Sequence, residues 1–249
     1  MPKYKVMNCE AYTALATCHN TDTIFMDPPD NIGLAYDKYE DKMKPADYNQ
    51  FLKECLHEAI DRAPTTYMSF NAKHLPWVGC LAYELSNFDV RFMVQGFTFG
   101  QNQKGDFTNN FRPIIRVCQK DAPRFPEQTK IESWRMRNGD KRANPEGTNP
   151  GDVWRPDFLE YSRVTGNSKQ RRTWHPTQLH EGLVEDLLLM STPPGGTVLD
   201  PFAGTGTTLR VCMANGWNCN TSDYDLDYCR KIGAEHEMQD FGSTWLLET

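Results

Sequence analysis

The sequence predicts an α/β protein with a mostly parallel sheet that helices cover on both faces. Short runs of apolar and β-branched residues alternate along the chain with longer stretches whose apolar residues recur at helical spacing. Two of the strand-like runs end directly in a motif rich in proline or glycine. Alternation of strands and helices is typical of parallel sheets, because each parallel connection must cross back over the sheet.

Seven strands and five helices are expected from local residue spacing. Within 47–62, Tyr48, Leu52 and Cys55 recur on one helical face, and Pro176 suits the first position of a helix that runs to Ser191. The expected strands lie at 4–8, 23–26, 65–70, 91–99, 112–119, 197–200 and 217–223. The expected helices lie at 47–62, 75–86, 176–191, 207–215 and 226–238.

Bulk composition is that of an ordinary globular chain of 249 residues, with 39% hydrophobic and 24% charged residues. No apolar run approaches the roughly 20 residues that a membrane span needs, and the N-terminus lacks the apolar stretch of a signal peptide. We therefore expect an intracellular protein without a membrane segment. The eight cysteines form no Cys-x-x-Cys pair, so we expect reduced thiols and no metal site.

Positive charge is concentrated in one stretch of an acidic chain. The net charge is −6, but 124–172 holds 11 Lys and Arg against 7 Asp and Glu, and 163–172 holds four basic residues and no acid. This part of the chain, 121–172, is also rich in proline, glycine and asparagine, with little periodicity. A local basic strip is what contact with phosphates requires, although a solvated surface loop has the same composition.

The first motif is the string DPFAGTGTT at 200–208, which follows the strand 197–200 and precedes a helix. Its glycines let the backbone approach a ligand closely, and the helix N-terminus offers N–H groups to an anion. The spacing fits neither the dinucleotide fingerprint nor the P-loop. A bare Gly-x-Gly would be a tight turn, whereas the whole string in this context favours a cofactor site. Asp223 ends the next strand, where an acid can bind ribose hydroxyls; alone it would be a solvated loop acid.

The second motif is Asp27-Pro28-Pro29-Asp30, which follows the strand 23–26. It places a carboxylate and proline-fixed carbonyl groups at the C-terminal edge of a sheet, where α/β folds bind their ligands. An isolated Asp-Pro-Pro would be a rigid turn, so the motif gains meaning only from the glycine-containing loop later in the chain.

Together with Trp174-His175-Pro176-Thr177-Gln178, these motifs resemble the beta class of S-adenosylmethionine-dependent DNA amino-methyltransferases. In that class Asp-Pro-Pro comes first, a basic variable region follows and the cofactor loop is last, as here. The stretch 163–178 looks like phage and bacterial members of the class. The resemblance implies a class I, Rossmann-like methyltransferase fold with seven strands, an antiparallel edge and circularly permuted motifs, in a protein of the bacterial cytoplasm. It further implies that 1–120 is the catalytic half, 121–172 a target-recognition insertion and 173–249 the half that binds S-adenosylmethionine.

Site residues follow from the resemblance position by position. The catalytic motif comprises Asp27, Pro28, Pro29 and the following Asp30. Asn8 stands where the family usually has an acid beside the cofactor adenine, although an asparagine at a strand end equally suits capping a turn. The full set of expected cofactor-binding residues is Asn8, Asp27, Thr177, Gln178, Asp200, Phe202, Gly204, Thr205, Gly206, Thr207 and Asp223.

The implied reaction is methyl transfer to an exocyclic amine of a base flipped out of double-stranded DNA. Such an amine is a poor nucleophile, because its lone pair is delocalised into the ring. A carboxylate and a proline carbonyl that accept both N–H bonds would localise the lone pair. Asp-Pro-Pro resembles the adenine-N6 subset; cytosine N4 is the alternative, and a catalytically silent protein that binds DNA or cofactor is another. A homodimer and a cognate restriction nuclease are compatible with the resemblance.

The chain departs from the family at Asp30, where an aromatic residue usually stacks on the flipped base. Either another ring stacks instead (Tyr36, Tyr39 or Phe107), or the substrate is atypical, or the enzyme is slow or inactive. We favour a substituted ring. Two neighbouring carboxyls also predict that one of them has a raised pKa.

The basic segment supplies candidate phosphate contacts, with Trp134, Trp154 and Trp174 as wedges into DNA or as core residues. The expected DNA-binding residues are Arg135, Arg137, Lys141, Arg142, Lys169, Arg171 and Arg172.

Overall fold

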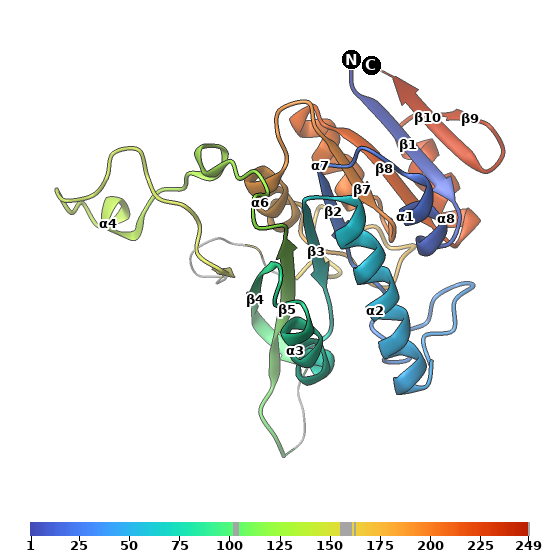
Figure 1. Cartoon of the computed structure of the whole chain (residues 1–249), viewed down its shortest axis with the longest axis horizontal. Helices are drawn as coiled ribbons and strands as arrows, with labels where there is room; N and C mark the ends of the chain where they lie inside the picture. Colours follow the sequence, from blue (N-terminus) through green and yellow to red (C-terminus); the bar gives the residue numbers. More distant parts are fainter. Residues whose placement is uncertain (102–104, 155–160, 162, 249) are drawn as a thin grey trace.

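The computed structural model describes residues 1–101, 105–154, 161 and 163–248, and its strands form a single twisted sheet (Figure 1). In spatial order the strands are β6 (Val153–Trp154), β4 (Asp89–Gln101), β5 (Asn109–Cys118), β3 (Thr65–Ser69), β2 (Thr23–Met26), β7 (Thr197–Asp200), β8 (Asn218–Asp223), β1 (Lys3–Asn8), β10 (Thr244–Glu248) and β9 (Gln239–Asp240).

The five central strands, from β3 to β1, run parallel, and β5 lies antiparallel beside β3. All seven expected strands form, but the expected total of seven is wrong, since the described residues form ten. The three additional strands, β6, β9 and β10, lie at the two ends of the sheet. The first two have only two residues each, too few to show an alternating pattern. The third, β10, pairs with β1, and its Trp245 is buried in the core.

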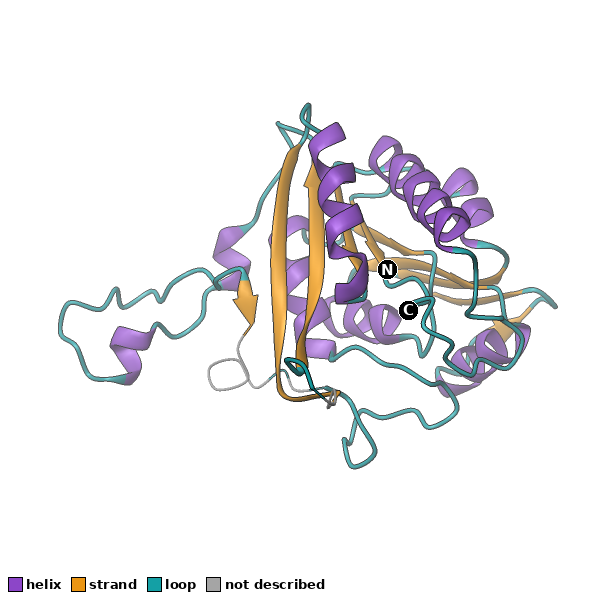
Figure 2. Ribbon diagram, turned by 90° about the horizontal axis from the view of Figure 1, so that it is seen from below, coloured by secondary structure: helices purple, strands orange, loops and turns teal. Residues whose placement is uncertain are grey.

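Helices cover both faces of the sheet (Figure 2), and each face has its own apolar core. One face carries α1 (Ala11–Thr17), α2 (Pro45–Arg62) and α3 (Leu75–Glu84), while the other carries α6 (Glu181–Ser191), α7 (Thr207–Asn215) and α8 (Leu226–Glu235). Short helical turns are η1 (Ala72–His74), η2 (Pro126–Thr129) and α4 (Trp134–Arg137). No described helix combines the length and apolar composition that crossing a membrane requires.

The helix expected from Pro176 begins only at Glu181. His180 is its N-cap, and a ring nitrogen of His180 accepts a hydrogen bond from the Gly182 N–H at 3.1 Å. Residues 175–179 instead form a loop in which Nδ1 of His175 lies 2.6 Å from the carbonyl oxygen of Thr177. A local hydrogen bond between side chain and backbone thus competes with the helix that the proline would permit.

Most of the predicted insertion is an arm that leaves the body of the protein and carries α4 (Figures 1 and 2). The arm begins at η2, which is tied to α6 by the Phe125 N–H and the Met190 carbonyl, and it returns to the sheet as β6 beside β4. A single bridge between Ile131 and Thr148 closes its base. The part of the insertion at 155–160 and 162 lies outside the described residues.

The parallel strands bring the two sequence motifs to one edge of the sheet. β2 pairs directly with β7, so Asp27, which follows β2, and Asp200, which ends β7, lie at the carboxyl ends of neighbouring strands. β7 pairs with β8, where Asp200 is opposite Thr221, and β8 pairs with β1, where Asp223 is opposite Asn8. The carboxyl ends of parallel strands therefore place residues far apart in sequence side by side.

Candidate active site

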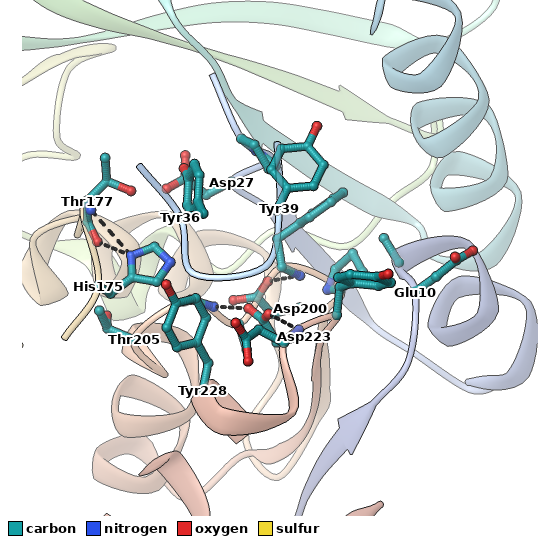
Figure 3. Close-up of a pocket in the computed structure, with 18 of the residues that line it drawn as sticks. Glu10, Asp27, Tyr36, Tyr39, His175, Thr177, Asp200, Thr205, Asp223 and Tyr228 are labelled. Atoms are coloured by element: carbon teal, nitrogen blue, oxygen red, sulfur yellow. Dashed lines mark hydrogen bonds between the residues drawn. The ribbon is translucent and has the colours of Figure 1, made fainter. Parts of the chain in front are cut away.

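A cavity of about 580 Å³ opens at this edge and is lined by both motifs (Figure 3). Its volume lies within the range of roughly 300–1,000 Å³ typical of small-molecule sites. Most of the expected cofactor-binding residues line it. They are Asp27, Thr177, Gln178, Asp200, Phe202, Gly204, Thr205, Thr207 and Asp223. Tyr36 lies beside Asp27 at one end, and Asp200 and Asp223 lie together near the glycine loop (Figure 3).

The glycine loop is shaped by two left-handed residues, Gly204 at φ +51° and Gly206 at φ +76°. The Gly204 N–H donates to a carboxyl oxygen of Asp223 at 2.9 Å, which ties the loop to the end of β8. Gly206 is not among the residues that line the cavity. A side chain there would meet Ile232 at 3.2 Å, so Gly206 permits the turn and close packing against α8.

Asp200 is a buried acid and Asp223 a half-buried one, and both accept backbone hydrogen bonds. Asp200 accepts from Phe202 at 2.9 Å, and Asp223 accepts from Asp225 at 2.8 Å. Burial raises the pKa of Asp200 to about 7 and the pKa of Asp223 to about 6. Loss of hydration disfavours the charged carboxylate, and the backbone donors compensate only in part. Both groups therefore change charge close to neutral pH.

Asn8 caps a turn and is not among the residues that line the cavity. Its side-chain amide donates to the carbonyl oxygens of Asp223 at 3.0 Å and Tyr224 at 2.9 Å. The sequence left two roles open for Asn8, contact with the cofactor adenine and capping of a turn. The geometry supports the capping of a turn. Glu10, two residues later, does line the cavity.

The loop that carries Thr177 and Gln178 adds a residue that sequence reasoning passed over, His175. It is 8% exposed, and its ring lies edge-on to Tyr36 at 5.5 Å and to Tyr228 at 4.9 Å. Burial lowers the pKa of His175 to about 4, so the ring is neutral at physiological pH. The amide of Gln178 is used within the loop, where it accepts from the Arg172 N–H at 2.8 Å. Tyr228 lies outside every sequence motif, so no pattern indicated it. His175 lies inside the motif Trp174-His175-Pro176-Thr177-Gln178, which is the signal that could have identified it.

The catalytic motif is held by an arginine that no sequence pattern indicated. Nη2 of Arg112, in β5, lies 2.6 Å from Oδ1 of Asp27 and 3.0 Å from Oδ1 of Asp30. Its Nη1 donates to Oδ2 of Asp30 at 3.1 Å, and its Nε donates to the Ser69 hydroxyl at 2.5 Å. Asp30 is 7% exposed and is thus part of a buried ion pair.

Asp27 is the carboxyl with the raised pKa, as the pairing of two acids predicted. Burial is the main cause, the Arg112 guanidinium opposes it, and the charge of Asp30 adds to it. Burial also disfavours ionisation of Asp30, but its ion pair with Arg112 prevails and holds the pKa of Asp30 below the ordinary value. Asp30 is therefore charged throughout the physiological range.

Two of the three candidate stacking rings lie in the cavity. Tyr36 and Tyr39 both line it and contact each other edge-on at 5.8 Å, whereas Phe107 lies in the β4–β5 connection and is 93% exposed. The loop that carries the tyrosines is fixed by Asp41, whose carboxylate accepts backbone hydrogen bonds from Asn31 at 2.7 Å and Leu34 at 3.0 Å.

The seven expected phosphate-binding residues lie in two places. Four are exposed on the arm: Arg135, Arg137, Lys141 and Arg142. Among these, Arg142 pairs with Asp140 at 2.8 Å and Arg137 with Glu132 at 3.2 Å.

The other three lie just before the loop that carries His175, and only Lys169 among them is exposed. Arg171 donates to the His175 carbonyl at 2.6 Å, and Arg172 pairs with Glu235 of α8. These two arginines hold the loop that carries His175. Neutralising them would disturb this loop, so they are a poor test of DNA contact.

The tryptophans of the basic segment separate into core and surface. Trp154 is buried and donates from its indole nitrogen to Asp186 at 2.9 Å, and Trp174 packs on Tyr228 at 5.5 Å. Trp134, on the arm, is 64% exposed. Only Trp134 remains as a candidate wedge.

One cavity is lined by a glycine loop at the end of β7, an acid at the end of β8 and the carboxylate of Asp-Pro-Pro. This arrangement defines a class I methyltransferase fold. The family model N6_N4_Mtase, described as DNA methylase, matches residues 21–235. The chain belongs to this DNA methylase family.

Individual relatives agree with the family. DNA adenine methyltransferase YhdJ of Escherichia coli (strain K12) is 28% identical over 211 residues, which cover 79% of this chain and 69% of that protein. Type II methyltransferase M.HpaI of Haemophilus parainfluenzae is 28% identical over 202 residues, which cover 78% of this chain but only 61% of M.HpaI. Among solved structures, the M1.HpyAVI–SAM complex has a TM-score of 0.64 at 17% identity and covers 94% of this chain and 100% of that one.

Proposed function

We propose that this protein transfers a methyl group from S-adenosylmethionine to adenine N6 in DNA. The observation that carries the proposal is the Asp27 carboxylate, which lines the cavity of the glycine loop and has one oxygen held by Arg112. The name of YhdJ as a DNA adenine methyltransferase supports adenine, and the type II name of M.HpaI supports a restriction-modification setting.

The chemistry of the site suits an exocyclic amine. The cofactor supplies an electrophilic methyl group, so the protein has to orient the amine and localise its lone pair. We assign this task to Asp27 and to a proline carbonyl oxygen of the motif; Pro29 lines the cavity, and its carbonyl also accepts a hydrogen bond from the hydroxyl of Tyr48. Burial of Asp27 strengthens a hydrogen bond from the amine, since few water molecules compete for the carboxylate.

The residues around the cavity fit S-adenosylmethionine. One carboxyl oxygen of Asp225 is buried with no hydrogen-bond partner among the described residues, and Asp225 lines the cavity next to Asp223. Two adjacent acids suit the ribose hydroxyls, which are donors. We propose that Asp223 and Asp225 bind the ribose, while Phe202 and the backbone of Gly204 pack against the rest of the cofactor.

Expression in a methylation-deficient host, followed by nucleoside analysis of the host DNA, tests the function. N6-methyladenine in the DNA supports the proposal. N4-methylcytosine in the DNA would show that the target base is cytosine and not adenine. Cofactor binding without methylation of any DNA would show that the protein binds its ligands but does not catalyse the transfer.

Tyr36 is the ring that we propose to stack on the flipped base, because it lies beside Asp27 (Figure 3). Tyr36→Ala is expected to lower methyl transfer by about tenfold to 100-fold, the range for loss of one aromatic ring stacked on a base. Tyr36→Phe should keep most of the activity, because stacking needs the ring and not the hydroxyl. Single-turnover rates measure both, and Phe107→Ala is the control. Equal rates for Tyr36→Ala and the wild type would remove Tyr36 from this role.

The arm between η2 and β6 is our proposed DNA contact, because Trp134, Arg135 and Lys141 are exposed on it. Arg135→Gln combined with Lys141→Gln should weaken binding to every DNA sequence and lower the slope of log affinity against log salt by about two. Affinity for the cofactor should not change. Lys3→Gln combined with Lys53→Gln removes the same charge elsewhere and is the control. DNA titrations at several salt concentrations decide; an unchanged slope in the arm variant would contradict the proposal.

A further inference from the structure

The ion pair of Asp30 and Arg112 lies behind Asp27 and outside the main cavity. Asp27 lines the large cavity, whereas Asp30 and Arg112 line a separate cavity of about 80 Å³ together with Asn71 and Phe111. The aromatic residue that the family usually carries after Asp-Pro-Pro would stack on the base. In this chain the side chain at position 30 points instead toward β5, where it pairs with the guanidinium of Arg112, and neither of the two lines the main cavity.

Arg112 is the link between the two carboxyls. One nitrogen, Nη2, is shared between Asp27 at 2.6 Å and Asp30 at 3.0 Å, while Nη1 is given to Asp30 alone at 3.1 Å. Two contacts to Asp30 and a third to Ser69 fix the plane of the guanidinium. Because the guanidinium is rigid and planar, its hydrogen bonds to Asp30 and Ser69 also define the direction of the Nη2 N–H toward Asp27.

We propose that Asp30 and Arg112 are positioning residues for the methyl transfer: Asp30 fixes the guanidinium, and Arg112 orients the Asp27 carboxylate and keeps it ionised for the target amine. This inference rests on the proposed function, because it gives Asp27 the role of acceptor. It also gives Asp30 a task in the reaction, although a carboxylate has no ring with which to stack.

Opposite effects on the pKa of Asp27 follow from the charges that face it. These are Arg112 from β5 and Asp30 from its own loop, with Asp200 at the end of β7 and the phenol of Tyr36 further along the cavity. Among the strongest influences on the pKa of Asp27, the Arg112 cation lowers it, whereas both burial and Asp30 raise it. Removing the cation should therefore raise the pKa of Asp27 further, whereas removing the charge of Asp30 should lower it.

The test compares Arg112→Gln with Asp30→Asn in pH profiles of kcat/KM for methyl transfer to DNA. Because Asp27 must be ionised to accept the amine, the acidic limb of the profile follows its pKa. Arg112→Gln should move this limb to higher pH by about one to three units. Asp30→Asn keeps an acceptor for Arg112 and should move the limb to lower pH by about one unit.

A matched control lies on the same strand. Arg116 of β5 also pairs with an aspartate, Asp89, at 3.3 Å, but at the other end of the strand. Arg116→Gln and Asp89→Asn remove the same groups and should leave the acidic limb in place. If Arg112→Gln does not fold, Arg112→Lys takes its place: it keeps the cation, so the limb should move little, while kcat falls because an ammonium group cannot donate to Asp27, Asp30 and Ser69 in the fixed directions of a guanidinium.

A second readout does not depend on activity. Carboxyl ¹³C signals of labelled aspartate give the pKa of Asp27 directly, with the signal assigned by its absence in Asp27→Asn. The same shifts, up in Arg112→Gln and down in Asp30→Asn, are expected there. Shifts in the NMR titration without methylation of any DNA would reject the proposed function and keep the charge coupling. The inference would be overturned if the pKa of Asp27 stayed unchanged in both variants, or if it shifted in the same direction in both.

Discussion

Asp27→Asn is expected to lower methyl transfer to DNA by about 10³-fold, the size of effect seen when a positioned acceptor and its charge are removed together. The asparagine has nearly the shape of the aspartate, so the loss would come from chemistry. Arg112 donates to Oδ1 of Asp27, and in the variant it would select the amide oxygen as its acceptor. The amide NH₂ would then face the cavity and oppose the N–H bonds of the target amine.

Single-turnover transfer of a labelled methyl group to DNA measures this loss. Cofactor affinity, measured in parallel, should stay within about tenfold of the wild-type value, because the glycine loop and the acids after β8 are untouched. Asp37→Asn is the matched control, since Asp37 is an exposed aspartate of the same loop. A wild-type rate in Asp27→Asn would show that the acceptor lies elsewhere, and Asp27 would then be a structural partner of Arg112.

Much of the fold could be read from local patterns, because the central strands and the flanking helices have several residues that repeat on one face. β2 begins and ends where the sequence indicated, and α2 starts only two residues earlier than expected. The strands that were missed are too short to show a period or lie at the end of the sheet. The late start of α6 was missed for another reason: a hydrogen bond between His175 and Thr177 decides it, and propensity does not.

The site residues, like the strands and helices, fall into two groups: those that a local motif indicates and those that only the tertiary structure brings to the site. Residues inside a contiguous motif, such as Asp27 and Gly204, were identified because each motif is placed by the strand before it. Arg112 could not be identified, because it is 85 residues from Asp27 and meets it only through the pairing of β5 with β3. Arg171 is the converse case: a basic residue in a basic segment looks solvent-facing, yet it donates to the backbone of the His175 loop, and its contact with DNA stays a prediction.

Gly204→Val is expected to weaken binding of S-adenosylmethionine by about 100-fold or more, equivalent to roughly 2.7 kcal/mol. Two effects act together. The residue has φ +51°, which a β-branched side chain rarely adopts. A Cβ there would already touch the ring of His175 at 3.4 Å, and the two methyl groups of valine would extend from it into the cavity.

Gly216→Val separates these two effects. Gly216 has φ +68° at the other end of α7, and a Cβ added there would meet nothing within 4 Å. Both variants should therefore lose similar thermal stability through backbone strain, of about 1–2 kcal/mol, while only Gly204→Val should lose the cofactor. Calorimetric titration with S-adenosylmethionine and thermal unfolding of both variants provide the comparison. Equal affinity losses would mean that strain in α7, and not closure of the cavity, controls binding, and the glycine loop would then no longer be the cofactor contact.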